Sequence, residues 1–242
     1  MTALLALEGI IVCAQLVETV TGFGATVISL AFGAHLVPLE SLVVTLVIIG
    51  CLQSLWLVFR GWRHIRWALL ARTVLPASAP GLALGAYLFA SLGTPVLKLL
   101  LGGFIILVST VELGRLLRRG EDPRALPTPL AWGVVFAGGF FHGMFATGGP
   151  LMVYFFSRTV HDKQAFRATL SVLWLLLNTV LLVSYAWTGR LEEEPVHRAL
   201  YLAPALIAGI VLGELLHRRM TERIFRTSVQ LVLLGTGVAM VV

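Results

Sequence analysis

His142-Gly143-Met144-Phe145-Ala146-Thr147-Gly148-Gly149-Pro150-Leu151-Met152-Val153-Tyr154 lies inside an apolar run and decides how the chain is organised. Its glycines and proline are residues that a continuous helix disfavours. A similar stretch, Glu18-Thr19-Val20-Thr21-Gly22-Phe23-Gly24-Ala25-Thr26, occurs in the first half of the chain. The sequence therefore predicts two interrupted helices, which we interpret as the halves of one site.

The composition is that of a membrane protein. Of the 242 residues, 58% are hydrophobic and only 12% are charged, which predicts an all-helical polytopic membrane protein. The net charge of +6 comes from arginines clustered between apolar runs, a pattern that reports membrane topology and not a nucleic-acid partner. Cys13 and Cys51 lie in apolar segments, so we expect no disulfide, metal site or cofactor. Glu8 interrupts the first apolar run and no positive charge precedes it, so we expect no cleaved signal peptide.

Two of the apolar segments have an unusual length. A bilayer core needs about 20 residues per helix, so the first and fifth segments are too long for one upright crossing and too short for two. Each contains one of the glycine breaks, and each is either a strongly tilted helix or a re-entrant hairpin. The segments are 3–37, 41–59, 67–92, 95–114, 128–157, 168–187, 199–216 and 224–242.

The distribution of positive charge favours a hairpin for segment 128–157. If all segments cross once, the loops on the two sides carry ten and eight Lys or Arg residues, so there is no bias toward the cytoplasm. If 128–157 enters and leaves on the cytoplasmic side, fifteen positive charges fall on that side. Only Lys98, Arg190 and Arg198 remain outside, so we predict a cytoplasmic hairpin.

An internal repeat divides the chain into two halves. Leu75-Pro76 and Gly81 to Leu88 recur as Ala203-Pro204 and Gly209 to Leu216, at one constant offset in the numbering. Corresponding loops of the two halves carry opposite charge, which indicates halves of inverted orientation. We therefore predict two inverted repeats, each a hairpin plus three spans, with both termini external. The repeats are 1–115 and 128–242, joined by a cytoplasmic linker at 116–127.

The glycine breaks resemble those of the sulfite exporter family known as TauE/SafE. The resemblance rests on Thr21-Gly22-Phe23-Gly24 in the first half and on Gly148-Gly149-Pro150 through Tyr154 in the second, with Asn178 and Gly189 further along. It implies export of sulfite, sulfoacetate or related organosulfonates across the bacterial inner membrane. A half-helix that begins at a glycine turn presents unpaired N–H groups and a positive dipole end, which suits a small anion.

Two ionisable residues lie close to the breaks. Placing an ionisable side chain such as Glu18 or His142 at membrane depth costs free energy, so both residues are candidates for proton coupling. His142 is equally explained as a neutral ring bonded to a backbone carbonyl that the break frees, and Glu18 as a cap of the half-helix. Asn178 and Gln53 can donate to an oxyanion or join two helices, whereas we expect Trp174 to pack or to face the membrane interface. The predicted substrate-binding residues are Thr21, Gly22, Phe23, Gly24, Thr26, Gln53, His142, Thr147, Gly148, Gly149 and Asn178.

These features together predict a secondary transporter, not an enzyme, that works by alternating access around a midplane anion site. An anion channel of the same architecture is the main alternative. An intramembrane enzyme that uses His142 is a weaker one, because the sequence shows no acidic metal cluster and no nucleophile with an oriented base. The expected partners are the small anion and the lipid bilayer, and a homodimer is left open.

Overall fold

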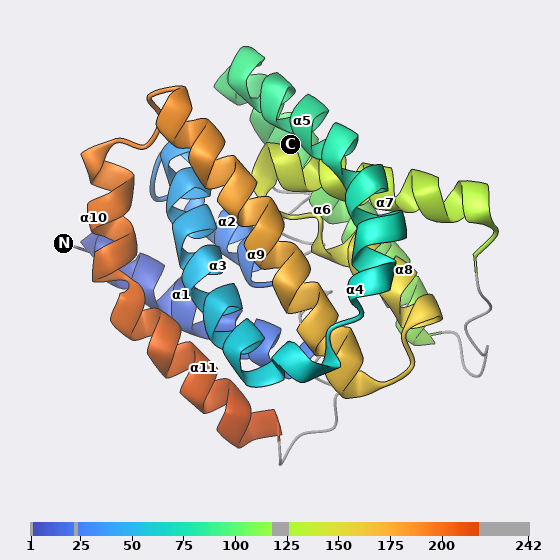
Figure 1. Cartoon of the computed structure of the whole chain (residues 1–242). Helices are drawn as coiled ribbons and strands as arrows, with labels where there is room; N and C mark the ends of the chain where they lie inside the picture. Colours follow the sequence, from blue (N-terminus) through green and yellow to red (C-terminus); the bar gives the residue numbers. More distant parts are fainter. Residues whose placement is uncertain (1, 22–23, 118–125, 218–242) are drawn as a thin grey trace. The chain divides into compact units, whose positions relative to one another are not determined.

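The computed structural model describes residues 2–21, 24–117 and 126–217 (Figure 1). Within these ranges all regular secondary structure is helical, which confirms the all-helical prediction. The predicted last span 224–242 and most of the linker 116–127 lie outside the described residues.

The first apolar segment forms two helices with a break at the first glycine stretch. α1 spans Thr2–Thr21 and α2 spans Ala25–Gly33. Gly24 has φ 106°, a left-handed conformation that glycine adopts without a steric penalty. The nine residues of α2 extend only about 13 Å, less than half of a bilayer core. α1 and α2 pack against each other, so α2 is a half-length helix that lies beside a longer one.

The second glycine stretch breaks the fifth segment in the same way. α7 spans Thr128–Phe145 and α8 spans Gly149–Thr159. Ala146 ends α7 with φ 53°, an uncommon conformation for a residue other than glycine. A Cβ atom on Gly148 would overlap the carbonyl oxygen of Gly138 and would lie 2.9 Å from the Cβ of His142. Only glycine at this position lets α8 begin directly against α7.

The remaining helices include several that are long enough to cross a membrane. In the part of the chain that the structure describes, three helical stretches pass by length and hydropathy: Leu39–His64, Trp67–Ser91 and Gln164–Trp187. A fourth is obtained if α10 and α11 count as one broken span. The helices are α3 (Leu39–Gly61), a 3₁₀ turn (Trp62–His64), α4 (Trp67–Leu69), a π-helical turn (Leu70–Val74), α5 (Leu75–Ser91), α6 (Thr94–Leu117), α9 (Lys163–Trp187), α10 (Glu193–Tyr201) and α11 (Ala203–His217).

The seventh segment differs from its predicted bounds of 199–216. The helix begins earlier, because Glu193 and Glu194 occupy the first turn of α10, where acidic side chains stabilise the N-terminal end of the helix dipole. The helix is interrupted at Leu202. Pro204 lies in the first turn of α11, and a helix that ran on through this proline would lose a backbone hydrogen bond and clash with its ring.

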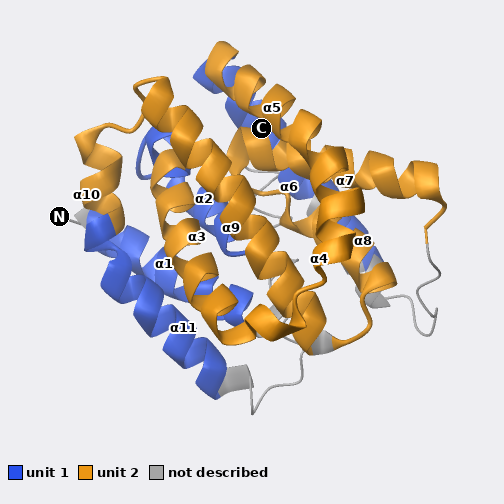
Figure 2. Ribbon diagram, in the orientation of Figure 1, with its two compact units in different colours: residues 1–43, 92–122, 200–242 blue, residues 44–91, 123–199 orange. Residues whose placement is uncertain are grey.

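The chain divides into two compact units (Figure 2). Unit 1 consists of Met1–Val43, Leu92–Asp122 and Leu200–Val242, and unit 2 of Val44–Ser91 and Pro123–Ala199. Each unit therefore combines segments from both halves of the sequence.

In unit 2, α5 and α7 pack with their backbones in contact through glycines one helical turn apart. A Cβ atom on Gly81 or Gly85 of α5 would overlap the carbonyl oxygen of Phe136 or Phe140 of α7. Gly139 and Gly143 of α7 fit in the same way against the backbone of α5. Small residues at this spacing let membrane helices approach closely and gain packing energy, so α5 fixes the helix that carries the second break.

In unit 1, α11 packs against α1 through a matching pair of glycines. A Cβ atom on Gly209 would lie 2.6 Å from the Cβ of Gln15, and one on Gly213 would lie 2.6 Å from the Cβ of Thr19. Gly209 and Gly213 are the repeat equivalents of Gly81 and Gly85. The same glycine pair therefore holds the helix before each break, once in each unit.

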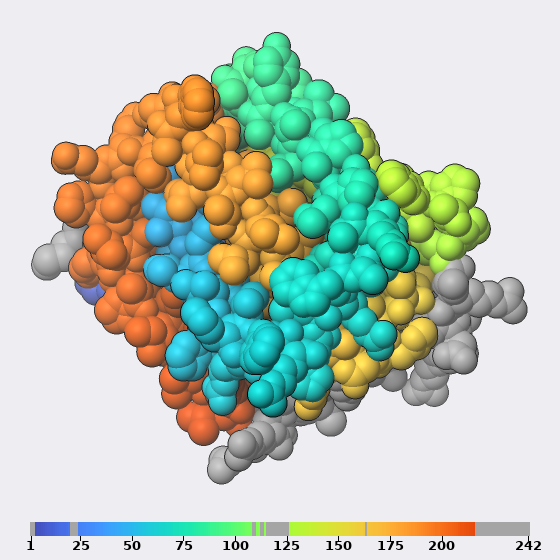
Figure 3. Space-filling model, viewed as in Figure 1, coloured from blue at the N-terminus to red at the C-terminus, as the bar shows by residue number. Residues whose placement is uncertain are grey.

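The helices α3 and α9 pack side by side and antiparallel in unit 2. A Cβ atom on Gly50 would lie 2.8 Å from Nδ2 of Asn178, and one on Gly61 would lie 3.0 Å from the Cβ of Ala168. The contact nearer the C-terminal end of α3 is thus the one nearer the N-terminal end of α9, as expected for antiparallel helices. Figure 3 shows side chains of α9 (orange) filling the surface between α3 (blue) and the segment of α4 and α5 (teal).

Large apolar side chains are exposed along the outer faces of several helices. On α9, Val180, Val183 and Trp187 are 54%, 58% and 89% exposed, at the three- and four-residue spacing of one helix face. Continuous exposed apolar faces are rare in water-soluble proteins and are typical of surfaces that contact lipid. Similar faces occur on α3 (Leu52, Leu55, Trp56, Phe59), α6 (Val96, Leu99, Leu100, Leu107, Val111) and α11 (Ile207, Val211, Leu212, Leu215).

Candidate functional site

The structure joins His142 of α7 to Asn178 of α9, two residues that the sequence singled out separately. Nε2 of His142 lies 3.1 Å from Oδ1 of Asn178, and the two residues are 2% and 5% exposed. The partner of the imidazole is therefore a side-chain amide. It is not the freed backbone carbonyl considered from the sequence.

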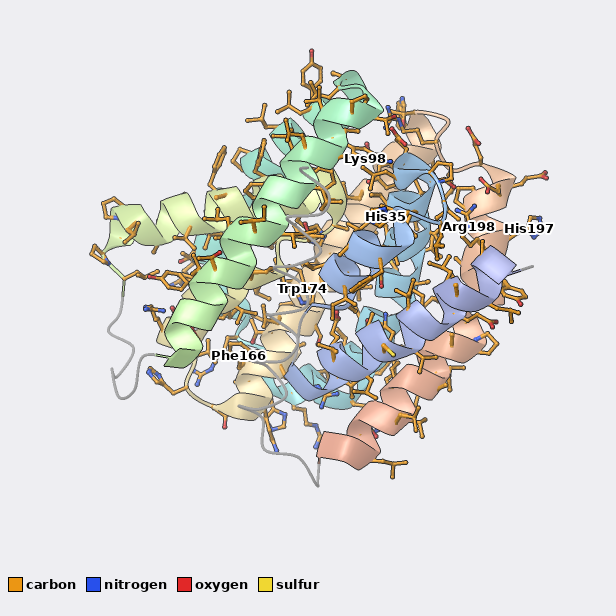
Figure 4. The ribbon with its side chains drawn as sticks, turned by 180° about the vertical axis from the view of Figure 1, so that it is seen from behind. His35, Lys98, Phe166, Trp174, His197 and Arg198 are labelled. Atoms are coloured by element: carbon orange, nitrogen blue, oxygen red, sulfur yellow. The ribbon has the colours of Figure 1, made fainter. Side chains whose placement is uncertain are left out.

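Trp174, one turn before Asn178 on α9, covers the imidazole. The two rings are stacked, with centroids 5.4 Å apart and planes 10° from parallel. Trp174 is 9% exposed, and Figure 4 labels it on α9. The expectation that Trp174 packs is thus correct, and what it packs on is a candidate site residue.

Gly50 of α3 completes the surroundings of the amide. Because a Cβ atom at Gly50 would lie 2.8 Å from Nδ2 of Asn178, a larger residue would push the amide away from His142. Gln53 lies almost one turn further along α3, on the same side of the helix as Gly50, and is 4% exposed.

The second break brings two more polar groups to this cluster. Thr147 is 2% exposed, and its Oγ1 has no hydrogen-bond partner among the described residues. Nδ1 of His142 likewise has none within the described part of the chain. Gly148 lies against His142, so both groups belong to residues next to the start of α8.

The start of α8 supplies backbone donors. Gly148 is the N-cap and Gly149 the first helical residue, and the first N–H groups of a helix have no partner within it. Pro150 has no N–H, which leaves the amides of its neighbours as the donors of this turn. Together with the Thr147 hydroxyl they form a concentration of donors at a positive helix end, suited to a small anion.

The first break lies in unit 1 and has a different chemistry. Oε2 of Glu18 accepts a hydrogen bond from the backbone N–H of Ala25 at 2.9 Å, so the carboxylate caps the start of α2. Thr26 is half-buried in the first turn of α2. Gly22, Phe23 and the side chain of Thr21 lie outside the described residues.

Sequence reasoning missed two positions, Gly50 and Arg198. Gly50 was not singled out, although it is the repeat equivalent of Asn178 and the repeat could have indicated it. Arg198 was counted only as an external charge, yet it is 7% exposed, is paired with Glu194 and donates through Nη1 to Oγ1 of Thr45 at 3.5 Å. Figure 4 labels Arg198 beside His197 on α10. In residues 2–21, 24–117 and 126–217, no three His, Cys, Asp or Glu side chains form a group that could hold a metal ion.

Comparison of the sequence with known proteins places the chain in a family. The family model described as sulfite exporter TauE/SafE matches residues 7–240. The "Probable sulfite/organosulfonate exporter TauE" of Cupriavidus necator is 27% identical over 218 residues, which cover 87% of this chain and 82% of that protein. The "Probable inner membrane transporter protein TsaS" of Comamonas testosteroni is 27% identical over 187 residues, 74% of each chain. No solved structure matches the chain.

The match extends over nearly the whole sequence and both glycine breaks. The family is one of transporters, so the expectation of a transporter that is not an enzyme is confirmed. The chain belongs to the TauE/SafE family of sulfite exporters.

Proposed function

We propose that this protein exports small sulfur-containing anions, such as sulfite, sulfoacetate or related organosulfonates, across the bacterial inner membrane by alternating access. The single observation that carries the proposal is the start of α8 in unit 2. There a half-length helix begins at Gly148, directly against His142, with the buried hydroxyl of Thr147 beside it. Backbone amides and a hydroxyl bind an oxyanion without burying a permanent positive charge.

The helix packing supports two inverted repeats. Two equivalent helices related by an in-plane two-fold axis are antiparallel and meet at equivalent residues. α3 and α9 are antiparallel, and Gly50 contacts Asn178, its equivalent at the offset of the repeat. The glycine pairs of α5 and α11, at the same offset, each hold the helix before a break.

On this proposal the first break is the inverted counterpart of the second. Glu18 would keep α2 in place through its bond to Ala25, and Thr21 to Thr26 would supply the other half of the midplane site. Both termini would be external. Export of an anion down the membrane potential gains about 2.3 kcal/mol per charge per 100 mV, so no coupling ion is required.

Binding and flux of anions test the transport function. Purified protein should be stabilised against thermal unfolding by sulfite or a sulfonate, because a ligand that binds only the folded state stabilises it by mass action. In proteoliposomes, flux of that anion should saturate and should be stimulated by anion on the opposite side. Unsaturable flux near the diffusion limit would favour the channel instead, and a panel of sulfite, sulfoacetate, taurine, sulfate and carboxylates without any stabilising member would contradict the proposal.

Single-cysteine labelling tests the topology separately. Cys13 and Cys51 are replaced by serine, and His161→Cys or Glu192→Cys is introduced, since His161 and Glu192 are both exposed. We expect a membrane-impermeant maleimide applied to intact cells to label Glu192→Cys and to leave His161→Cys unlabelled until the cells are opened. Labelling of His161→Cys from outside would rule out the cytoplasmic hairpin.

A further inference from the structure

We infer that the site at the start of α8 takes an anion that carries its own hydrogen-bond donor, such as hydrogensulfite or a hydroxy- or amino-sulfonate. The inference rests on the proposed function and narrows its substrate class. It follows from the hydrogen-bonding roles of the two ring nitrogens of His142.

The first step is the proton on Nε2. Oδ1 of Asn178 lies 3.1 Å from Nε2, and a carbonyl oxygen can only accept a hydrogen bond. Nε2 therefore carries the proton and donates it. Gly50 leaves the space that the Asn178 amide occupies, and the stack on Trp174 holds the plane of the ring.

The second step is the role of Nδ1. In a neutral imidazole with its proton on Nε2, Nδ1 bears a lone pair and can only accept. Nδ1 is buried and has no hydrogen-bond partner among the described residues. A buried acceptor without a donor is costly, because its desolvation is not compensated. The bound ligand is the natural source of that donor.

The third step is the complementarity of the whole site. The N–H groups at the start of α8 and the hydroxyl of Thr147 donate to the oxygens of an anion. Nδ1 of His142 has the opposite polarity and would repel a bare oxyanion oxygen. An anion with oxygens on one side and an O–H or N–H on the other satisfies both sets of groups.

A matched pair of ligands tests this. Ethanesulfonate and 2-hydroxyethanesulfonate have the same charge and differ by one hydroxyl donor. We expect the hydroxylated anion to bind about tenfold tighter or more, the effect of leaving a buried acceptor unpaired, measured by calorimetry and thermal shift. His142→Phe keeps a ring for the stack on Trp174 but removes the acceptor, so it should bind both anions alike. Tyr185→Phe removes a different buried hydroxyl of unit 2 that also lacks a partner among the described residues, and it should keep the preference.

A spectroscopic measurement tests the ring without any ligand. In protein labelled with ¹⁵N at histidine, the His142 signals, assigned by their absence in His142→Phe, should show a proton on Nε2 and none on Nδ1. Asn178→Leu should abolish this fixed tautomer and reduce the preference for the hydroxylated anion.

The outcomes separate the two proposals. Protein that binds sulfite or sulfoacetate but binds the two test anions equally, or binds neither of them, would overturn the donor requirement and leave anion export intact. A proton on Nδ1 in the ligand-free protein would overturn it as well. Protein that binds no anion at all would contradict the proposed function.

Discussion

Gly50 of α3 and Asn178 of α9 lie in contact in unit 2, and they are equivalent positions of the internal repeat. The repeat has a small residue in one copy and an amide in the other, and the small residue provides the space for the amide. This asymmetry lets Asn178 reach Nε2 of His142. One copy of the repeat therefore shapes a site whose polar groups belong to the other.

The contact makes Gly50→Val a test of the site at a residue that bears no functional group. The valine side chain would displace the Asn178 amide from His142, since even its Cβ would lie 2.8 Å from Nδ2. We expect the anion concentration needed for half-maximal thermal stabilisation to rise at least tenfold, while the protein remains folded. Gly103→Val on α6 is the control, because a Cβ at Gly103 would meet nothing within 4 Å among the described residues beyond its chain neighbours and the adjacent backbone of its own helix. Unchanged potency in Gly50→Val would show that the amide does not contribute.

Substitution of the close-packed glycines should affect stability in both units. Gly85→Ala would force its Cβ into the carbonyl oxygen of Phe140, and we expect a loss of about 1–3 kcal/mol from overpacking. Gly213→Ala should behave similarly, with its Cβ 2.6 Å from that of Thr19. Thermal unfolding in detergent measures both effects, with Gly9→Ala as the control because the described residues leave space around it. Equal melting temperatures for Gly85→Ala and Gly9→Ala would contradict the backbone contact.

Exchanging alanine and glycine at the two positive-φ positions, Ala146 and Gly24, should change the stability in opposite directions. Ala146 has φ 53°, so Ala146→Gly should relieve about 1 kcal/mol of strain in the native state, partly offset by the greater freedom of glycine in the unfolded chain. Gly24 has φ 106°, so Gly24→Ala should destabilise the protein. Unfolding temperatures of the pair check the prediction, and a destabilised Ala146→Gly would indicate that the alanine methyl group contributes packing that outweighs the strain.

Glu18 can be tested as a cap and as a proton carrier with one pair of variants. Glu18→Gln keeps a side-chain oxygen that can accept from the N–H of Ala25, whereas Glu18→Ala removes it. We expect near wild-type stability for the first variant and a loss of about 1 kcal/mol for the second, as for other helix caps. Transport in proteoliposomes completes the test, because Glu18→Gln with normal stability but without transport would favour a role in proton coupling.

Arg198 and Glu194 should contribute unequally to stability. Arg198 is buried and its partner Glu194 is largely exposed, so Glu194→Ala leaves a buried guanidinium without its carboxylate. Arg198→Met replaces the charged side chain by a shorter, unbranched apolar one, a kind of change that is often tolerated. Thermal unfolding should therefore show a larger loss for Glu194→Ala than for Arg198→Met, with Glu193→Ala as the neighbouring control. The reverse order would show that the remaining contacts of Arg198 outweigh its pairing with Glu194.

Composition and glycine position were sufficient to predict that the described segments are helical and that the first and fifth of them are broken. Segment 128–157 separates into α7 and α8 at the glycine stretch because Ala146 to Gly148 turn the chain back against α7. Sequence reasoning also selected His142 and Asn178, since polar groups at membrane depth are rare.

The pairing of these residues could not be predicted, because it depends on which helices are neighbours. A hydropathy profile does not reveal that α9 packs beside His142, or that Trp174 covers the imidazole ring. Arg198 was missed for a related reason, since its burial comes from contact of α10 with Thr45 of α3. Periodicity identifies the buried face of a helix and leaves its partner open.

The packing of α1 on α11 and of α7 on α5 also sets an order of events during synthesis. α1 and its break leave the ribosome first, but the glycines that hold α1 are on α11, which is made after most of the chain. α7, in contrast, can pack on α5 soon after it is synthesised, because α5 precedes it in the chain. Unit 2 can thus assemble while translation continues, and unit 1 closes only near its end.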